Sequence, residues 1–380
     1  MKIEVNREVF IKTLNTSCSI TGGKTALPIL YENLFRFNNK RLEVVSSDLE
    51  NIIVTGLNYE LVDGEEESFV VDGSTILKTI QLLSIETIYL DVEVDANGFG
   101  TVTFGDPKRK KKYQIPISHA AESFPRIPDT NTTATIKLKA EPFKKGLKLC
   151  TPLCNPSDLR PGFQGVGIYT KDSRLIVSST NGHSIVQVGF EVEGELPPMI
   201  VSKTTSNIID NFSNDAVVEI SVEDVTKKIV FTDGSIHVYS TLIDGKFPPI
   251  DNVIDSIDTT SNVVFNRVEV LQAIKRCVIM SSRETHALKF DFSQEGLILS
   301  AEDIDWSKKS TEEAQVISKI GEVNYELKLN GILTSQFLSG METEEVTMYT
   351  KAPSTPVLFT PNNFDSFSCK FVLMPLRIAQ

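Results

Sequence analysis

The chain has 380 residues, of which 41% are apolar, and a formal net charge of −12. Its length predicts two to four domains, each able to bury a core, and no stretch approaches the roughly 20 apolar residues that a membrane span needs. The N-terminal segment MKIEVNREVFIK lacks the apolar region of a signal peptide. We therefore expect a cytoplasmic protein.

A short strand, a polar residue and a helical pattern occur together three times along the chain. IEVNREVFIKTLN begins at Ile3, IKLKAEPFKKGLKLC at Ile136 and VVFNRVEVLQAIKRC at Val263. Apolar residues at helical spacing are expected to seat each helix on a sheet. The predicted helices cover residues 6–20, 141–151 and 266–280.

Two further elements repeat in the same order. The first is LEVVSSDLENIIV, then LIVSSTNGHSIVQV, then LILSAEDIDWSKKS; the second is FVVDGSTILKTI, then MIVSKTTSNIID, then LKLNGILTSQFL. In the second element Asp72, Ser202 and Asn330 each stand where a helix N-cap belongs. The closing turns of the first two copies, Phe124–Ile127 and Phe247–Ile250, also agree. The chain is therefore interpreted as three copies of one domain.

Each copy predicts an α+β domain, with antiparallel sheets and two helices packed on one face. Alternating segments such as TIYLDVEV and AVVEISVED are typical of half-buried strands, and Asn97-Gly98 and Asp233-Gly234 mark hairpin turns. Polar linkers are expected at 126–134 and 252–261. The predicted domains are residues 1–128, 134–253 and 261–380.

Five scattered cysteines, an odd number, suit a reducing compartment. Cys150 and Cys154 could share a helix face, but a metal site would need further ligands and no histidine is near in sequence. Buried small apolar side chains are the favoured interpretation. We predict no metal and no cofactor.

The net negative charge alone argues against a nucleic-acid partner, but the charges are segregated. The six predicted helices carry +5, so the rest of the chain carries −17. One interpretation is that lysine simply favours solvated helix faces; the other is a helix face that meets DNA phosphates without reading bases. For the second, the candidates are Arg7, Lys12, Lys78, Lys144, Lys145, Lys148, Lys203, Lys275 and Arg276.

A basic run at 108–112 lies between two predicted strands. It is either a further phosphate contact or a solvated hairpin. Gly98 and Gly100 lie in a hairpin, not between a strand and a helix, so no phosphate-binding loop is predicted.

Several motifs resemble the β subunit of bacterial DNA polymerase III, the β sliding clamp. They are distributed over all three copies, in order: Ala26–Leu30, Asp48–Glu50, Thr180–His183, Leu242–Pro248 and Val372–Arg377. The segment SAEDID from Ser300 is most similar to clamps of the Bacteroidetes lineage.

This resemblance implies a DNA sliding clamp, a head-to-tail homodimer of three-domain chains that closes into a ring around duplex DNA. Tyr113 of one subunit would oppose Ile279 and Met280 of the other. Lys24 and Arg160 correspond to basic loop residues that face DNA. The implied partners are the DNA polymerase III catalytic subunit, a clamp loader, and other polymerases and repair proteins.

The resemblance also implies a pocket for partner peptides of the form Gln-Leu-x-Leu-Phe. Its residues would be Phe163, Thr180, Gly182, His183, Ile185, Pro248, Asn252, Val253, Val372, Met374, Pro375, Leu376 and Arg377. This chain departs from the family at Ser184 and Asn252, where arginine is usual, and at Asn181, where aspartate is usual. The preferred peptide is therefore expected to differ.

Other classes of function are weaker. Thr180–His183 with Asp172, or Asp303 with Asp305, could suggest catalysis, but no nucleophile or oxyanion arrangement accompanies them, so we predict no catalytic residues. A clamp paralogue serving a repair polymerase or mobile element remains the alternative. A scaffold that never encircles DNA fits the charge segregation less well.

Overall fold

The computed structural model describes residues 1–22, 25–38, 40–106, 108, 110–128, 134–223, 227–293, 296–362 and 367–377. The chain forms two compact units, each built from two separate stretches. Unit 1 comprises Met1–Ala140 with Ile208–Leu242, and unit 2 comprises Glu141–Asn207 with Ile243–Gln380. Each unit therefore draws on the middle repeat. The three-domain division remains a prediction from the repeats.

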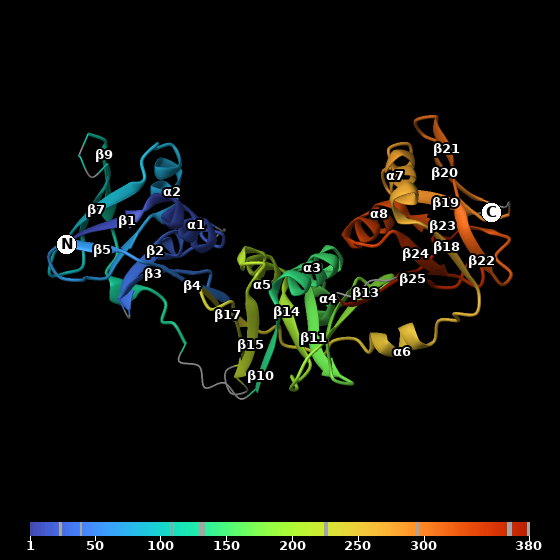
Figure 1. Ribbon diagram of the computed structural model, residues 1–380, viewed down its shortest axis with the longest axis horizontal. Coiled ribbons are helices and arrows are strands. Elements are labelled where there is room, and N and C mark those ends of the chain that lie inside the picture. The colour runs from blue at the N-terminus through green and yellow to red at the C-terminus, as the bar shows by residue number, and fades with distance from the viewer. Residues whose placement is uncertain are drawn as a thin grey trace. The chain divides into compact units, whose positions relative to one another are not determined.

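Unit 1 contains two antiparallel sheets (Figure 1). The strands of the smaller sheet are, in spatial order, β5 (Glu60–Asp63), β1 (Lys2–Asn6), β7 (Thr87–Val94), β8 (Gly100–Gly105) and β9 (Lys112–Ile117). Those of the larger are β10 (Ala134–Lys139), β15 (Val217–Glu223), β16 (Lys228–Thr232), β17 (Ile236–Thr241), β4 (Asn51–Leu57), β3 (Arg41–Ser47), β2 (Asn33–Asn38) and β6 (Phe69–Val71).

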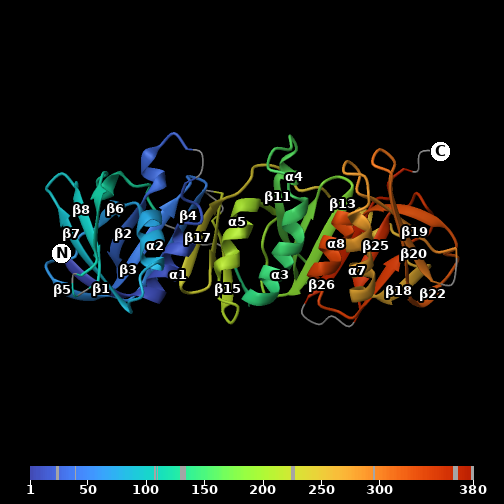
Figure 2. The same ribbon diagram turned by 90° about the horizontal axis from the view of Figure 1, so that it is seen from above.

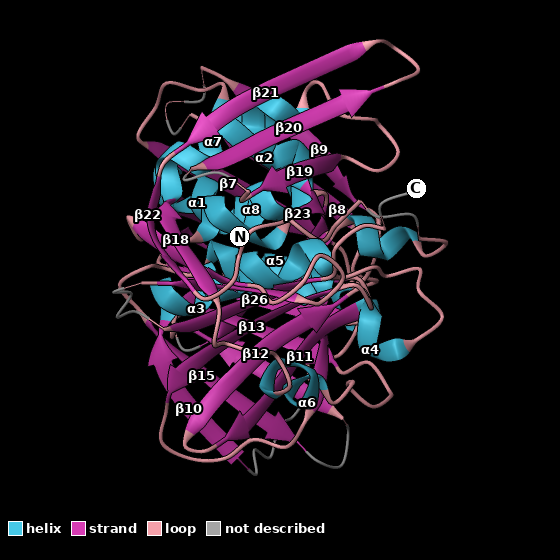
Figure 3. Cartoon of the chain, turned by 90° about the vertical axis from the view of Figure 1, so that its right-hand side faces the viewer, coloured by secondary structure: helices cyan, strands magenta, loops and turns pink. Residues whose placement is uncertain are grey.

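Unit 2 also contains two antiparallel sheets. The strands of the larger are β14 (Met199–Ser202), β11 (Gly165–Lys171), β12 (Arg174–Thr180), β13 (Ser184–Glu191), β26 (Ser368–Leu373), β25 (Val357–Pro361), β24 (Glu345–Tyr349), β18 (Asn262–Asn266) and β22 (Val316–Ile320). Those of the smaller are β21 (Lys308–Ala314), β20 (Leu297–Asp303), β19 (Ala287–Asp291) and β23 (Glu326–Asn330). Figure 3 shows β20 and β21 as a long hairpin.

The first helix and the second helix of each predicted copy are present. They are α1 (Arg7–Ser17), α2 (Gly73–Gln81), α3 (Ala140–Cys150), α5 (Lys203–Ile208), α7 (Arg267–Val278) and α8 (Gly331–Gly340). The predicted N-caps are confirmed, because Asp72, Ser202 and Asn330 each accept a backbone N–H three residues later, at 3.0, 3.1 and 2.9 Å. Figure 2 shows α1 beside α2, and α7 beside α8.

The helices of unit 1 pack on an aromatic core. Phe10 of α1 and Ile76 of α2 are fully buried in the same cluster as Phe35, Phe69 and Phe104 of the strands. Unit 2 uses the same device, with the ring of Phe337 on α8 stacked on that of Phe371 on β26, at 4.1 Å between centroids. Apolar burial on this scale dominates the stability of each unit.

Two short helices were not predicted. One is α4 (Pro161–Gln164), and the other is α6 (Ile250–Asp255), which overlaps the expected linker at 252–261. The prediction of a polar loop there was wrong over the first four residues. Ile250 and Ile254, one turn apart, are both buried against a sheet, and this spacing stabilises a helical turn.

Both of the larger sheets combine strands from two repeats. In unit 1, β17 of the second copy pairs with β4 of the first. In unit 2, β26 of the third copy pairs with β13 of the second. The repeats are therefore joined by continuous backbone ladders as well as by their linkers.

Candidate functional site: a partner pocket, basic helices and two open edges

A hollow of about 260 Å³ lies on unit 2, where the β12–β13 turn, α4, the segment around α6 and the end of β26 meet. Its lining is mainly apolar. The residues are Phe163, Thr180, Gly182, His183, Ser184, Ile185, Pro248, Pro249, Ile250, Val253, Val372 and Met374. A concave, mostly apolar surface with a few polar groups is typical of a site for an anchoring side chain of a partner.

The β12–β13 turn is closed by its own side chains. The Thr180 hydroxyl donates to the Ser184 carbonyl at 2.8 Å and accepts from the Gly182 N–H at 3.0 Å. The Asn181 side chain accepts from the N–H groups of His183 and Ser184. Gly182 has φ +87°, and a Cβ there would stand 3.2 Å from the Phe163 ring. Glycine therefore provides both the turn geometry and the open space beside Phe163.

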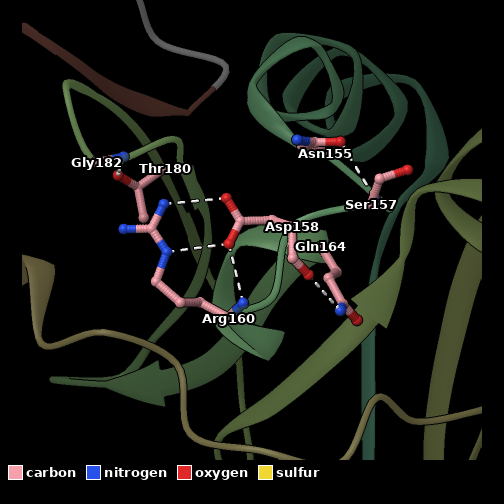
Figure 4. A network of polar contacts seen from close by, with 7 residues as sticks. All are labelled: Asn155, Ser157, Asp158, Arg160, Gln164, Thr180 and Gly182. Carbon is pink, nitrogen blue, oxygen red and sulfur yellow. Dashed lines mark hydrogen bonds and ion pairs between the residues drawn. The ribbon is translucent and has the colours of Figure 1, made fainter.

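The loop before α4 places the Arg160 cation over Phe163, a residue that lines the hollow. Figure 4 shows the polar contacts of this loop. The Arg160 guanidinium donates to both carboxylate oxygens of Asp158, each at 3.0 Å, and lies 3.7 Å from the Phe163 ring centroid. The hydrogen bonds from Arg160 lower the pKa of Asp158 to about 2. The Gln164 side chain donates to the Asp158 carbonyl at 2.7 Å. The loop is thus held by its own polar contacts, with Arg160 stacked over a pocket residue.

The end of the chain forms the opposite wall. The Met374 N–H donates to the His183 carbonyl at 2.9 Å, and the Leu376 N–H donates to the Lys328 carbonyl at 2.7 Å. Val372 is buried, whereas Met374 is 38% exposed. Plain core filling therefore accounts for Val372, but not for Met374.

Most of the predicted pocket residues meet at this hollow. Four do not line it: Asn252, Pro375, Leu376 and Arg377. Asn252 and Arg377 are exposed, and the other two are half-buried. Ser184, Pro249 and Ile250 line it but were not in the predicted set. Their position beside predicted residues in the sequence was the signal that could have found them.

The predicted DNA-facing residues differ in the contacts that they make. Lys12, Lys78 and Lys275 are exposed and form no ion pair with any other described residue. Others have partners within their own unit: Lys145 pairs with Glu141 and Glu342, and Arg276 with Glu312. Lys203 donates to the Cys154 carbonyl at 3.4 Å. Lys144 and Lys148 also have contacts, and Lys24 lies outside the described residues.

Arg7 connects the two helices of its domain. Its guanidinium donates to the carbonyls of Ile80 and Gln81 at the end of α2, at 2.8 and 2.9 Å. Arg267 makes a similar tie in the third copy, to the carbonyl of Leu338 in the last turn of α8 and to that of Thr343, which follows the helix. Carbonyls in the last turn of a helix lack intrahelical donors, and a cation there also interacts favourably with the negative end of the helix dipole. These two arginines therefore stabilise the helix pairs.

Among the described residues, each smaller sheet has an edge strand that pairs with no strand beyond it. Two such strands are β9, at one edge of the unit 1 sheet, and β21, at one edge of the unit 2 sheet. Tyr113, on β9, is 39% exposed. Ile279 and Met280 follow α7 and are exposed apolar side chains. An unpaired strand edge with exposed apolar side chains beside it is a surface that another chain can extend.

No family model matches the chain. Proteins named beta sliding clamp from Rickettsia bellii and Haemophilus influenzae are 23% and 22% identical to it, over the whole of both chains. A sliding clamp (DNA polymerase III subunit beta) of Pseudomonas aeruginosa, solved bound to griselimycin, superposes with a TM-score of 0.88 at 20% identity. The β subunit of Thermotoga maritima superposes with 0.85 at 19%, and both cover all of both chains. The chain is therefore similar to β sliding clamps over its full length.

Among the described residues, no group of three or more His, Cys, Asp or Glu side chains could hold a metal. Cys150 and Cys154 are buried free thiols, and burial raises the pKa of Cys154 to about 12. Neutral thiols in such places act as small apolar side chains. No described helix is long and apolar enough to cross a membrane.

Proposed function

We propose that the chain is a DNA sliding clamp, in which two copies join head to tail in a ring around duplex DNA and hold partner proteins at the hollow on unit 2. Full-length homology to β sliding clamps supports this function. The alternative, a paralogue serving a repair polymerase or mobile element, is not favoured by these relatives. The proposed site of action is the cytoplasm, and the proposed domains are residues 1–128, 134–253 and 261–380.

The open strand edges carry the proposal of a head-to-tail ring. By position in the repeat, β9 corresponds to β17 and β26, whereas β21 corresponds to β4 and β13. In the chain, β17 pairs with β4 and β26 pairs with β13, each time antiparallel. The third pair of this series, β9 with β21, is the only one of the three that does not form within the described chain. A second copy would complete it with the same kind of ladder, through a heterologous contact.

The two internal ladders predict the same register for this contact. Val238 stands opposite Ile53 in one, and Phe371 opposite Val186 in the other. In the repeats, Tyr113 occupies the position of Val238 and Phe371, and Ser310 occupies the position of Ile53 and Val186. Both pairs therefore place Tyr113 of one subunit opposite Ser310 of its partner. Lys111 would then face Glu312, an attractive cross-strand pair.

Cysteine cross-linking tests this register in the full chain. Tyr113→Cys with Ser310→Cys is expected to form an intersubunit disulfide under mild oxidation, seen as a dimer band that reductant removes. Gln114→Cys with Ser310→Cys is the matched control, because neighbouring side chains on a strand point to opposite faces. Equal cross-linking of the two pairs, or a strict monomer by light scattering at micromolar concentration, would refute the proposed interface.

DNA would be held by topology and only weakly by charge. Exposed lysines such as Lys12, Lys78 and Lys275 are the proposed phosphate contacts. Further candidates are Lys144, Lys145, Lys148, Lys203, Arg160 and Arg276. Such contacts are independent of sequence and weaken with salt, which permits sliding while a tethered polymerase gains effective concentration. Loading is assigned to an external clamp loader. The test is retention: a closed ring stays on circular DNA and leaves linear DNA, so equal retention on both would contradict it.

The hollow on unit 2 is proposed to bind a short peptide of the form Gln-Leu-x-Leu-Phe from the polymerase III catalytic subunit, the loader and other partners. Its apolar lining suits leucine and phenylalanine anchors. Asn252 and Arg377, exposed and outside the lining, are proposed to contact the flanks of the peptide. A fluorescent peptide should bind saturably, and Met374→Glu should abolish the binding because it introduces a charge into an apolar wall.

A further inference from the structure

One wall of the partner hollow is held differently from the others. Ile185 and Val372 stand directly opposite each other in the β13–β26 ladder, so backbone hydrogen bonds fix their positions. The facing wall is the segment 248–253, which contributes Pro248, Pro249, Ile250 and Val253. This segment belongs to no strand, and α6 within it has six residues. Its position therefore depends on side-chain contacts with the sheet.

The apolar contacts come from Phe247 and from the buried face of α6. Phe247 lies on Gly167 of β11, where an added Cβ would stand 2.6 Å from the ring. Ile250 and Ile254 are buried in one cluster with Leu358 and Val372. These contacts favour a docked segment, but apolar packing alone is non-directional.

The directional contact comes from Asp251, which lies in the sequence between Ile250 and Val253, two residues that line the hollow. Its carboxylate accepts from the Tyr169 hydroxyl at 3.0 Å and the Gln187 side chain at 2.6 Å, and pairs with the Lys171 ammonium at 3.2 Å. Tyr169 and Lys171 are on β11, and Gln187 is on β13. One side chain thus joins α6 to two strands of the sheet, and we name these four residues the Asp251 clasp.

The clasp holds a charged carboxylate. Partial burial acts to raise the pKa of Asp251, but hydrogen bonds from Gln187, Lys171 and Tyr169 outweigh it and hold the pKa below its ordinary value. Hydrogen bonds to an ionised acceptor are shorter and stronger than neutral ones. The group is therefore charged at neutral pH, when the clasp is closed.

We propose that Asp251 is a positioning residue for partner binding: its clasp on Tyr169, Lys171 and Gln187 keeps the wall 248–253 in the place that accepts the peptide. The inference rests on the proposed function of the hollow. Asp251 does not line the hollow itself, so its effect on binding acts through Ile250 and Val253 on either side of it. Apparent affinity is then the intrinsic affinity multiplied by the fraction of molecules in which the clasp is closed.

The test measures binding of a fluorescein-labelled Gln-Leu-Ser-Leu-Phe peptide to the full chain by anisotropy. Asp251→Ala is expected to raise Kd about tenfold, which corresponds to a fall in the closed fraction from near one to about one tenth. The matched control is Asp255→Ala, which removes the same charge from the exposed face of the same helix and should leave Kd within about twofold, as is usual for an exposed surface position.

A purely structural role is separated from positioning by the stoichiometry. Misfolded protein lowers the number of sites per chain without changing their Kd, whereas an open clasp raises Kd at an unchanged number of sites. Tyr169→Phe and Gln187→Met remove clasp donors from the sheet side, and either should weaken binding less when Asp251→Ala is already present, because the pairs are coupled.

Three outcomes decide the matter. A tenfold rise for Asp251→Ala, with full stoichiometry and a near-normal Asp255→Ala, supports the clasp. Wild-type binding that Asp251→Ala leaves unchanged overturns the clasp alone and leaves the pocket intact. A wild-type chain that does not bind the peptide overturns the proposed pocket and the clasp together.

Discussion

Replacement of Arg267 by methionine separates the arginines that stabilise the fold from the lysines proposed to meet DNA. The Arg267 guanidinium donates to Thr343 at 2.6 Å and to Leu338 at 3.0 Å, and both contacts are partly buried. A hydrogen bond from a charged group contributes about 1.5–3 kcal/mol. Methionine keeps the apolar stem, and water can reach part of the vacated site. We therefore expect a loss of about 2–3 kcal/mol for Arg267→Met.

Arg7→Met should cost less, about 1–2 kcal/mol, because one of its two hydrogen bonds is exposed. Lys275→Met is the control on the same helix as Arg267: its side chain is exposed, so the change in stability should stay within about 0.5 kcal/mol. The assay is urea unfolding followed by circular dichroism, comparing midpoints at equal slope. The reasoning fails if Arg267→Met and Lys275→Met unfold at the same midpoint, or if Arg267→Met, with its fold intact, weakens DNA association more than Lys275→Met does.

Three further predictions concern single positions. Burial lowers the pKa of His237, so the unfolded chain binds more protons near pH 6 and the stability falls as pH drops below about 6.5. Between pH 7.5 and 5.5, the urea unfolding midpoint should therefore fall further for the wild type than for His237→Gln. Equal falls for the two proteins would contradict this. Phe371→Ala removes a buried ring stacked on Phe337 and should cost about 3–5 kcal/mol in urea unfolding, whereas a loss below 1 kcal/mol would show that the site collapses. Gly182→Ala should weaken peptide binding, because it strains a turn at φ +87° and places a methyl group against Phe163; an unchanged Kd would refute the proposed role of this opening.

The sequence predicted the features that depend on local chemistry. Asp72 and Asn330 could be recognised as N-caps because a cap needs only its own side chain and the next three residues. The ties made by Arg7 and Arg267 could not, since each depends on where the end of a distant helix lies. At the sequence level both arginines were simply positive charges on predicted helices, and Arg7 was accordingly assigned to DNA. Their hydrogen bonds are a tertiary property.

The hollow was predicted in part for a related reason. A resemblance compares positions, and it identified Thr180, Gly182 and Met374, whose place follows from the order of the strands. It carries no information about volume, so it missed Pro249 and Ile250 at the start of α6. That helix forms because Ile250 and Ile254 bury one face, in a segment whose polar composition indicated a loop.

A clamp of repeated domains needs similar surfaces toward DNA, but its docking site for partners must differ from the equivalent surfaces of the other repeats. One turn shows how the repeats differ. The corresponding residue is Leu49 in the β3–β4 turn, Gly182 in the β12–β13 turn and Ile304 in the β20–β21 turn. Leu49 and Ile304 are exposed, at 58% and 83%, and only the second copy leaves this place empty. The first two turns share a backbone conformation, with φ +76° at Leu49 and +87° at Gly182, whereas the β20–β21 hairpin is longer. Between the first two copies, the absence of a side chain at Gly182 leaves the space next to Phe163 open. If the proposed function holds, partner specificity can change at the hollow without disturbing the lysines that are proposed to contact DNA.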